Sequence, residues 1–123
     1  VDFSDFLPTI CEATGTDFSK ESDVDGVSFL SQILGENQSN KKFIYSWYFP
    51  RPYIKAEDNK PIEWTRNESY KLYGDGSFFN VKNDFYEKTP LNKNELDDSQ
   101  TKNYNELMAG LEVYKKIKWE KSL

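Results

Sequence analysis

The sequence predicts an α+β fold, in which a four-stranded antiparallel sheet is covered on one face by a long C-terminal helix and preceded by N-terminal helical segments. Three observations support it. Residues 62–84 hold three short runs with apolar side chains at alternate positions, separated by two tight-turn sequences. Residues 43–49 alternate in the same way, and the run after Asp97 carries apolar residues at helical spacing. A chain of 123 residues buries enough surface for one hydrophobic core.

The central meander is expected to contain strands at Ile62–Arg66, 70–73 and 77–81. Asn67-Glu68-Ser69 and Gly74-Asp75-Gly76 supply the turns, because glycine accepts a positive φ and Asn and Asp side chains bond nearby backbone. The period-two residues of these strands are expected to face the core; they are Ile62, Trp64, Tyr70, Leu72, Phe79 and Val81.

Two elements flank the meander. Residues 43–49 carry aromatic or aliphatic side chains on both faces, which favours an inner strand. Further along, Asp97, Asp98 and Ser99 are alternative N-caps of a helix that is expected to run to about Trp119. Its apolar stripe consists of Tyr104, Leu107, Met108, Leu111, Tyr114 and Ile117.

The N-terminal region is predicted to hold two helical segments. Residues 1–15 carry a stripe that is interrupted at Pro8 and ends at Gly15; it consists of Phe3, Phe6, Leu7, Ile10 and Ala13. Ser28 is expected to cap one or two further helical turns, which Gly35 ends. We therefore divide the chain into an N-terminal helical segment, residues 1–35, and an α+β subdomain, residues 36–123.

Composition excludes several classes of function. The chain contains no histidine, so no histidine ligand or general base is available, and its net charge of −5 argues against nucleic acid as a partner. No stretch approaches the roughly 20 apolar residues of a membrane span, so no membrane partner is expected. Cys11 is the one cysteine, which rules out an intramolecular disulfide. Because the chain starts at Val1 inside a helical pattern, we expect it to be a fragment.

The residues themselves assign no catalytic and no metal-binding group. Two acidic pairs, Asp23 with Asp25 and Asp97 with Asp98, lack the graded spacing and distal Glu of a calcium loop. Three glutamates, Glu63, Glu68 and Glu87, give no sign of the burial that a general acid requires.

One stretch is a candidate for substrate contact. In Trp47-Tyr48-Phe49-Pro50-Arg51-Pro52-Tyr53, aromatic side chains precede an arginine at the end of a predicted strand. Aromatic faces stack on sugar or aryl rings, and the arginine fork matches the oxygens of a sulfate. We therefore name Trp47 and Arg51 as substrate-binding candidates, with core packing of the aromatics and a surface arginine as the alternative.

Four segments, in order, resemble the C-terminal subdomain of arylsulfatase-type sulfatases, members of the alkaline phosphatase-like superfamily. Residues 1–15 are similar to the family's Asp-x-x-Pro-Thr-Leu helix, and residues 25–35 to its Asp-Gly-x-Ser-Leu element. Residues 66–73 resemble its Arg-x-x-x-Tyr-Lys strand pair, and residues 79–87 its Tyr-Asp-Leu-x-x-Asp-Pro-x-Glu segment. Departures fall at loop positions: Ser31 and Phe85 stand where the family has Pro, and Pro90-Leu91 replaces Asn-Leu.

The resemblance implies a chemistry that lies outside this chain. Sulfatases hydrolyse sulfate esters with a formylglycine, made in a Cys/Ser-x-Pro/Ala-x-Arg motif, beside a calcium ion, and both belong to the upstream domain. Cys11 matches only part of that motif, because Gly15 stands where the arginine is needed. The fragment alone is expected to be inactive. The resemblance further implies a sulfated small molecule or glycan as substrate of the complete enzyme, contact between this chain and the catalytic domain, and a periplasmic or secreted location.

Two alternatives remain open from the sequence. One is a free-standing carbohydrate- or protein-binding module that uses an aromatic sheet face, and the other is the same subdomain of a related phosphoesterase or phosphonate hydrolase. The N-terminal apolar stripe separates the first from a sulfatase subdomain. A self-contained module is expected to bury this stripe within itself, whereas a subdomain is expected to offer it to the catalytic domain.

Overall fold

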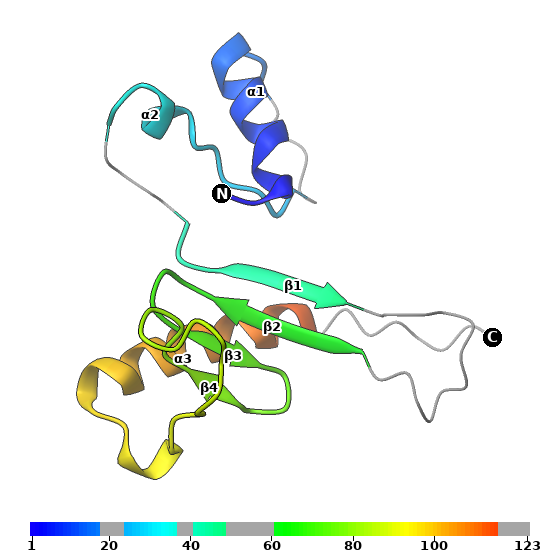
Figure 1. The fold of residues 1–123 in the computed structure, drawn as a ribbon. Helices are drawn as coiled ribbons and strands as arrows, with labels where there is room; N and C mark the ends of the chain where they lie inside the picture. Colours follow the sequence, from blue (N-terminus) through cyan, green and yellow to red (C-terminus); the bar gives the residue numbers. More distant parts are fainter. Residues whose placement is uncertain (18–23, 37–40, 49–60, 116–123) are drawn as a thin grey trace, which may run out of the picture. The chain divides into compact units, whose positions relative to one another are not determined.

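The computed structural model describes residues 1–17, 24–36, 41–48 and 61–115. The chain forms two compact units, Val1–Ile44 and Tyr45–Leu123, and each is described by itself (Figure 1). Within the described ranges, no helix is both long and apolar enough to cross a bilayer.

The first unit begins with a 3-10 turn, η1 (Phe3–Asp5), that leads directly into helix α1 (Phe6–Thr14). Pro8 does not interrupt this helix. It lies in the first turn, where a missing N–H removes no hydrogen bond within the helix. Gly15 ends α1 with a φ of 67°, the left-handed conformation that the sequence predicts for it.

A short second helix, α2 (Leu30–Ile33), completes this unit. The prediction that Ser28 caps this helix was wrong in position, because Phe29 is the N-cap and provides no side-chain cap. Ser28 lies one residue earlier, where its Oγ accepts a hydrogen bond from the Leu30 N–H at 3.2 Å. Gly35 follows the helix with a φ of 84°, and it is the predicted stop.

The second unit contains a four-stranded antiparallel sheet in the order β1-β2-β3-β4. Its strands are β1 (Ile44–Tyr48), β2 (Ile62–Arg66), β3 (Lys71–Tyr73) and β4 (Phe78–Phe79). The expectation of an inner strand at residues 43–49 was wrong, because β1 lies at the edge of the sheet. Its aromatic side chains do not require burial on both sides, since Trp47 and Tyr48 remain 43% and 56% exposed.

The two predicted turns of the meander are present. Asn67 Oδ1 accepts hydrogen bonds from the Ser69 N–H at 3.0 Å and from the Tyr70 N–H at 2.8 Å. In the second turn, Asp75 Oδ1 accepts from the Ser77 N–H at 2.9 Å, and Gly76 has a φ of 92°. Side-chain oxygens and a glycine therefore close both hairpins, as the sequence indicates.

After β4 the chain forms a 3-10 turn, η2 (Lys93–Glu95), and then helix α3 (Asp98–Lys115). Asp97 caps α3, because its Oδ1 accepts from the Gln100 N–H at 2.7 Å while Gln100 Oε1 accepts from the Asp97 N–H at 3.0 Å. This reciprocal pair is a capping box. The predicted end near Trp119 lies outside the described residues.

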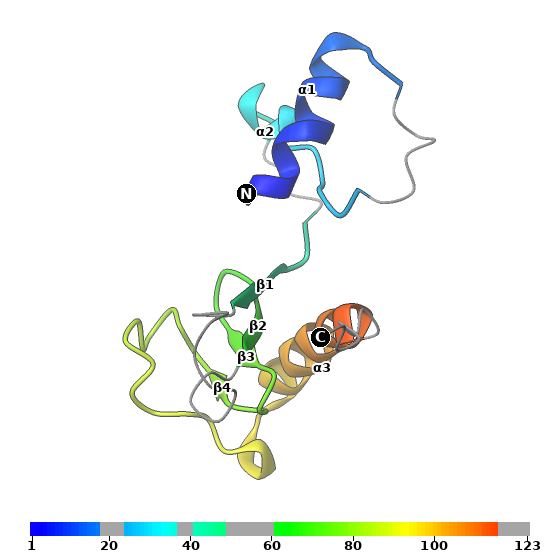
Figure 2. The same cartoon turned by 90° about the vertical axis from the view of Figure 1, so that its right-hand side faces the viewer.

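Helix α3 covers one face of the sheet, running behind the strands in Figure 1 and beside them in Figure 2. Leu72 pairs across the sheet with both Thr65 and Phe78, so the three side chains share this helix-facing side. On this side the sheet faces Leu107 and Leu111 of α3. Phe78 is 1% exposed, and the other four of these side chains are 0% exposed.

The prediction that Ile62 and Trp64 face the core was wrong. Trp64 pairs with Tyr73, one residue away from the Thr65 and Leu72 pair, so it lies on the face opposite α3. Ile62 remains 45% exposed. Alternation shows which residues of one strand share a face, but only the register between strands decides which face meets the helix.

Candidate functional site

The sequence-predicted substrate residues are not brought together in the described part of the chain. Trp47 lies near the end of β1 and is 43% exposed. Arg51 lies outside the described residues. Trp47 shares its side of β1 with Tyr45, whose ring stacks on Tyr114 of α3 with centroids 4.1 Å apart. The candidate pair therefore stays a prediction.

A different group of side chains gathers on the sheet face opposite α3. We call it the far-face cluster, and it consists of Trp64 and Arg66 from β2, Lys71 and Tyr73 from β3, and Glu87 from the loop after β4. Lys71 Nζ lies 2.8 Å from Glu87 Oε1, and the Tyr73 hydroxyl donates to Glu87 Oε2. Lys71 Nζ also lies 4.8 Å from the centre of the Trp64 ring and 4.5 Å from that of Tyr73. Both oxygens of this one carboxylate are therefore occupied.

The backbone at Glu87 holds its carboxylate in this position. Glu87 has a φ of 53°, a left-handed conformation that is unfavourable by about 1–3 kcal/mol for a residue other than glycine. The Glu87 N–H donates to the Asp84 carbonyl at 3.1 Å, and Asp84 Oδ2 accepts from the Thr89 N–H at 2.9 Å. These bonds on both sides of Glu87, together with its Lys71 and Tyr73 contacts, offset the strained backbone.

The charges of the cluster are fixed near neutral pH. Burial raises the pKa of Glu87, but hydrogen bonds from Lys71 and Tyr73 and the charges of Lys71 and Arg66 lower it more, so the net pKa is below the ordinary value. Burial lowers the pKa of Lys71, yet its contacts with Glu87 and Tyr73 leave the pKa raised. Burial and Glu87 together raise the pKa of Tyr73. No member of this trio titrates near neutral pH, so the trio suits binding rather than general acid-base catalysis.

A hollow of about 320 Å³ lies at the end of the β2–β3 hairpin. It is lined by Pro61, Ile62, Glu63, Tyr73, Gly74 and Asp75. The Tyr45 hydroxyl donates to Glu63 Oε2 at 3.2 Å; burial and the nearby Glu63 charge raise the pKa of Tyr45 to about 12. The volume is at the lower end of that of small-molecule sites.

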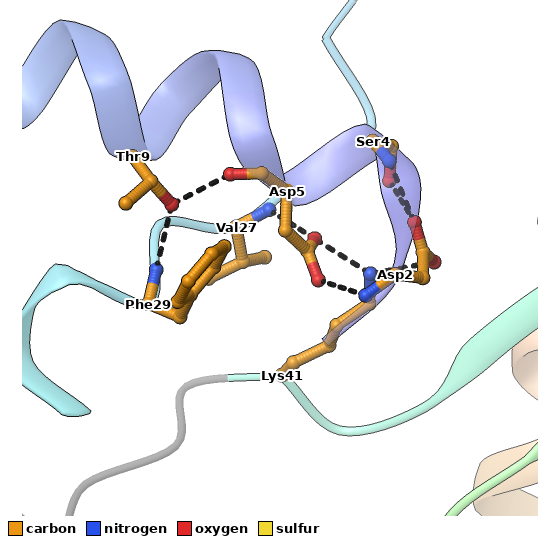
Figure 3. A network of polar contacts seen from close by, with 7 residues as sticks. All are labelled: Asp2, Ser4, Asp5, Thr9, Val27, Phe29 and Lys41. Carbon is orange, nitrogen blue, oxygen red and sulfur yellow. Dashed lines mark hydrogen bonds and ion pairs between the residues drawn. The ribbon is translucent and has the colours of Figure 1, made fainter. Parts of the chain in front are cut away.

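The first unit contains a second polar network, centred on Asp5 (Figure 3). Asp5 is 1% exposed, and its carboxylate accepts from three donors. Oδ2 accepts from the Asp2 N–H at 2.7 Å, while Oδ1 accepts from the Val27 N–H at 2.9 Å and from Lys41 Nζ at 2.7 Å. Asp5 therefore ties the start of the chain to two segments that follow much later in the sequence.

Two further contacts join the same segments. Thr9 Oγ1 donates to the Asp5 carbonyl at 2.6 Å and accepts from the Phe29 N–H at 3.1 Å. Gly26 passes so close to η1 that an added Cβ would lie 1.9 Å from the Ser4 carbonyl oxygen. This position therefore accepts glycine alone without a backbone shift.

Metal chemistry has no candidate in the described ranges, since no group of three or more Cys, Asp or Glu side chains gathers there. Cys11 is half-buried within α1. The calcium and formylglycine that the sulfatase resemblance implies were expected outside this chain, so its described residues do not test them.

Comparisons of the chain with protein-family models, with curated proteins and with solved structures found no match.

Sequence reasoning did not identify the far-face cluster as a site. One signal was available, since Lys71 and Tyr73 are two residues apart in a strand and must share a face. The partner, Glu87, lies 16 residues beyond Lys71, and its left-handed backbone has no sequence signal in a glutamate.

Proposed function

We propose that this chain is the C-terminal subdomain of a sulfatase-type hydrolase of sulfate esters, inactive by itself. The nucleophilic formylglycine and the calcium ion belong to an upstream catalytic domain, and the chain completes the enzyme as a structural subdomain. The complete enzyme acts on a sulfated small molecule or glycan and is periplasmic or secreted.

One observation carries this proposal: the residues at the sulfatase-like motif positions are the residues that join the segments to one another. In the first unit, Asp5 and Thr9 stand at the Asp and Thr of the first motif, and they bind the Val27 and Phe29 amides of the second. Gly26, at the glycine of that second motif, makes the close approach to Ser4.

The second unit repeats this relationship. Lys71, at the Lys of the third motif, forms its ion pair with Glu87, at the Glu of the fourth. Four short matches that arose by chance would have no reason to contact each other in pairs through their matching residues. The contacts therefore support a shared fold pattern, while the substrate class comes from the resemblance.

The N-terminal stripe favours a subdomain over a self-contained module. Within the first unit, α1 and η1 bury Asp5, Pro8 and Thr9, but leave the apolar stripe exposed. The exposed fractions are 91% for Phe3, 50% for Phe6, 55% for Leu7 and 58% for Ile10. An apolar stripe of this kind is typical of a surface that a further domain covers.

The complete parent protein provides the test. Its gene is expected to encode a Cys/Ser-x-Pro/Ala-x-Arg motif upstream of Val1. The parent protein, matured to carry formylglycine, is expected to hydrolyse a nitrophenyl or umbelliferyl sulfate. The present chain alone is expected to release no more product than a heat-killed control, because sulfate-ester hydrolysis needs an activated nucleophile in a prepositioned charged site.

Three results would contradict the proposal in different ways. A parent gene without the upstream motif would remove the sulfatase assignment and favour the binding module. Turnover by the chain alone, lost in Cys11→Ala, would show that Cys11 is a nucleophile after all. A parent that cleaves phosphate or phosphonate esters but not sulfate esters would favour the related hydrolases.

A further inference from the structure

Arg66 and Lys71 stand directly opposite each other across the β2–β3 hairpin. They are the last residue of β2 and the first residue of β3, and both lie on the sheet face opposite α3. Two like charges in directly opposed positions destabilise an antiparallel pair. The local sequence therefore carries a feature that sheet stability alone does not favour.

The two cations share one carboxylate unequally. Lys71 Nζ lies 2.8 Å from Glu87 Oε1, whereas among the described residues no carboxylate lies within ion-pair distance of Arg66. The one hydrogen bond that the described residues give the Arg66 side chain runs from Nε to the Asn67 carbonyl at 3.4 Å. The terminal nitrogens of the guanidinium therefore have no acceptor within this part of the chain.

Glu87 cannot turn toward Arg66 without breaking other contacts. Its two oxygens accept from Lys71 and from Tyr73, and its backbone is held with a φ of 53°. The cluster thus has two positive charges and one negative charge in a fixed arrangement. The excess positive charge lies at Arg66, which is half-buried rather than fully hydrated.

We propose that the far face of the sheet is an oxyanion-binding site, in which the Arg66 guanidinium contacts the anion directly and the Lys71 ammonium supports it electrostatically. The guanidinium fork matches two adjacent oxygens on one atom, so the ligand is a sulfate or a carboxylate group. The two sources are a sulfate ester and an acidic side chain of a protein. This site rests on the fold of the chain itself and is independent of the sulfatase proposal.

The test is an NMR titration of the ¹⁵N-labelled chain with sodium sulfate and, separately, with sodium acetate. Ionic strength is held constant with sodium chloride, so that only specific binding changes the spectrum. We expect saturable shifts of the Arg66 Nε–Hε signal and of amides in β2 and β3. Saturation by sulfate alone assigns the site to a sulfate ester, saturation by acetate alone assigns it to a carboxylate, and saturation by both confirms the shared oxyanion chemistry.

Three variants make the test specific. Arg66→Gln is expected to abolish the saturable shifts while the remaining spectrum keeps its native dispersion. Arg66→Lys is expected to weaken binding about tenfold, because a point charge replaces a bidentate fork. Lys102→Gln, which removes a positive charge from an exposed position of α3, is expected to bind like the unchanged protein.

The proposal fails if neither anion gives saturable shifts. It also fails if Arg66→Gln shows the same shifts as the unchanged protein, or if Lys102→Gln abolishes them. Each of these results leaves the assay of the parent enzyme unaffected.

Discussion

Thr65 Oγ1, at the centre of the sheet, donates a hydrogen bond to the Leu107 carbonyl of α3 at 2.9 Å. Both residues are 0% exposed, so this bond lies inside the hydrophobic layer between sheet and helix. A buried hydroxyl without a partner is unfavourable, so a shift of α3 along the sheet that separates Thr65 from the Leu107 carbonyl is opposed. The Thr65–Leu107 bond therefore helps to fix the axial position of the helix on the sheet.

The Thr65→Val variant tests this role. Valine keeps the shape of the side chain and removes the hydroxyl, while the Leu107 carbonyl keeps its place in the helical hydrogen bonding. We expect the free energy of unfolding to fall by about 1 kcal/mol, the usual net value of an intramolecular hydrogen bond. Urea denaturation measures it. Thr101→Val, at an exposed position of α3, is the control, with a change of less than about 0.5 kcal/mol. Equal stability of both variants would show that the bond contributes nothing.

A second prediction concerns the apolar contact between α3 and the sheet. Leu111 is 0% exposed, so Leu111→Ala is expected to reduce the free energy of unfolding by about 2–5 kcal/mol through lost burial and a cavity. Val113, two residues further along α3, is 60% exposed, and Val113→Ala is expected to change stability by less than about 0.5 kcal/mol. A loss in that small range for Leu111→Ala would place this side chain outside the core.

Local sequence signals predicted most of the second unit. The bounds of β2 are those expected, and the Asn67 and Gly76 turns are present. These features depend on contacts a few residues apart, which a sequence displays directly. The side of the sheet that faces α3 depends instead on the register between β2 and β3. The apolar Trp64 suggested that its own side of β2 faces α3, but the side that carries the buried Thr65 does so.

The candidate site illustrates the same limit more strongly. Trp47 and Arg51 were predicted to bind substrate because aromatic side chains precede an arginine within one short stretch of sequence. Only Trp47 lies in the described part of the chain. The ion pair between Lys71 and Glu87 joins two segments that only the folded loop brings together. Its Glu87 backbone is one that propensity would assign to glycine or asparagine, so no sequence rule would have placed this carboxylate.

A third prediction follows from the tight approach of Gly26 to η1. In Gly26→Ala the added methyl group would lie 1.9 Å from the Ser4 carbonyl oxygen, and the atoms that it meets are all backbone atoms of Ser4 and Asp5, so no side chain can turn aside to make room. We expect the first unit to lose at least about 3 kcal/mol of stability, the upper part of the range for overpacking.

Gly35→Ala is the matched control for Gly26→Ala. Nothing lies within 4 Å of the added methyl group at Gly35, but its φ of 84° is strained for alanine. We expect Gly35→Ala to lose about 1 kcal/mol of stability, because it introduces backbone strain without a steric collision. Amide hydrogen exchange in α1 measures both variants. If Gly26→Ala exchanges no faster than Gly35→Ala, the close approach to Ser4 is not present in solution.

The last prediction concerns the pH dependence of the first unit. Burial raises the pKa of Asp5, but hydrogen bonds from Lys41 and from the Val27 and Asp2 amides, together with the Lys41 charge, lower it more. The net pKa of Asp5 is therefore below its ordinary value. The pKa of Asp2 is also lowered: burial raises it, but the contacts with Lys41 and Ser4 lower it more. For Lys41, burial lowers the pKa, yet the two carboxylates leave it raised.

These directions define a plateau of stability. A lowered carboxyl pKa stabilises the folded unit above the unfolded value of about 3.9, and this contribution is lost as pH falls through the folded pKa. A raised lysine pKa stabilises below its unfolded value of about 10.4, and that contribution is lost as pH rises through the folded pKa. The protection factor of the Val27 amide is thus expected to be constant between these limits and to fall only below about pH 4 or above about pH 10.

Asp5→Asn separates this network from general charge effects. Asparagine has only one acceptor oxygen, so its NH₂ group must face a donor that now bonds to one of the two Asp5 carboxylate oxygens, and that hydrogen bond is lost. The substitution also leaves Lys41 paired with Asp2 alone. We expect the first unit to lose about 3 kcal/mol or more of stability. The Val27 amide is then expected to exchange rapidly at every pH. Glu12→Gln removes one negative charge from an exposed position of α1 and should leave Val27 protected. The lowered pKa of Asp5 places its titration below about pH 5. A Val27 protection factor that already declines between about pH 7 and pH 5 would therefore mean that a group other than Asp5 controls this unit.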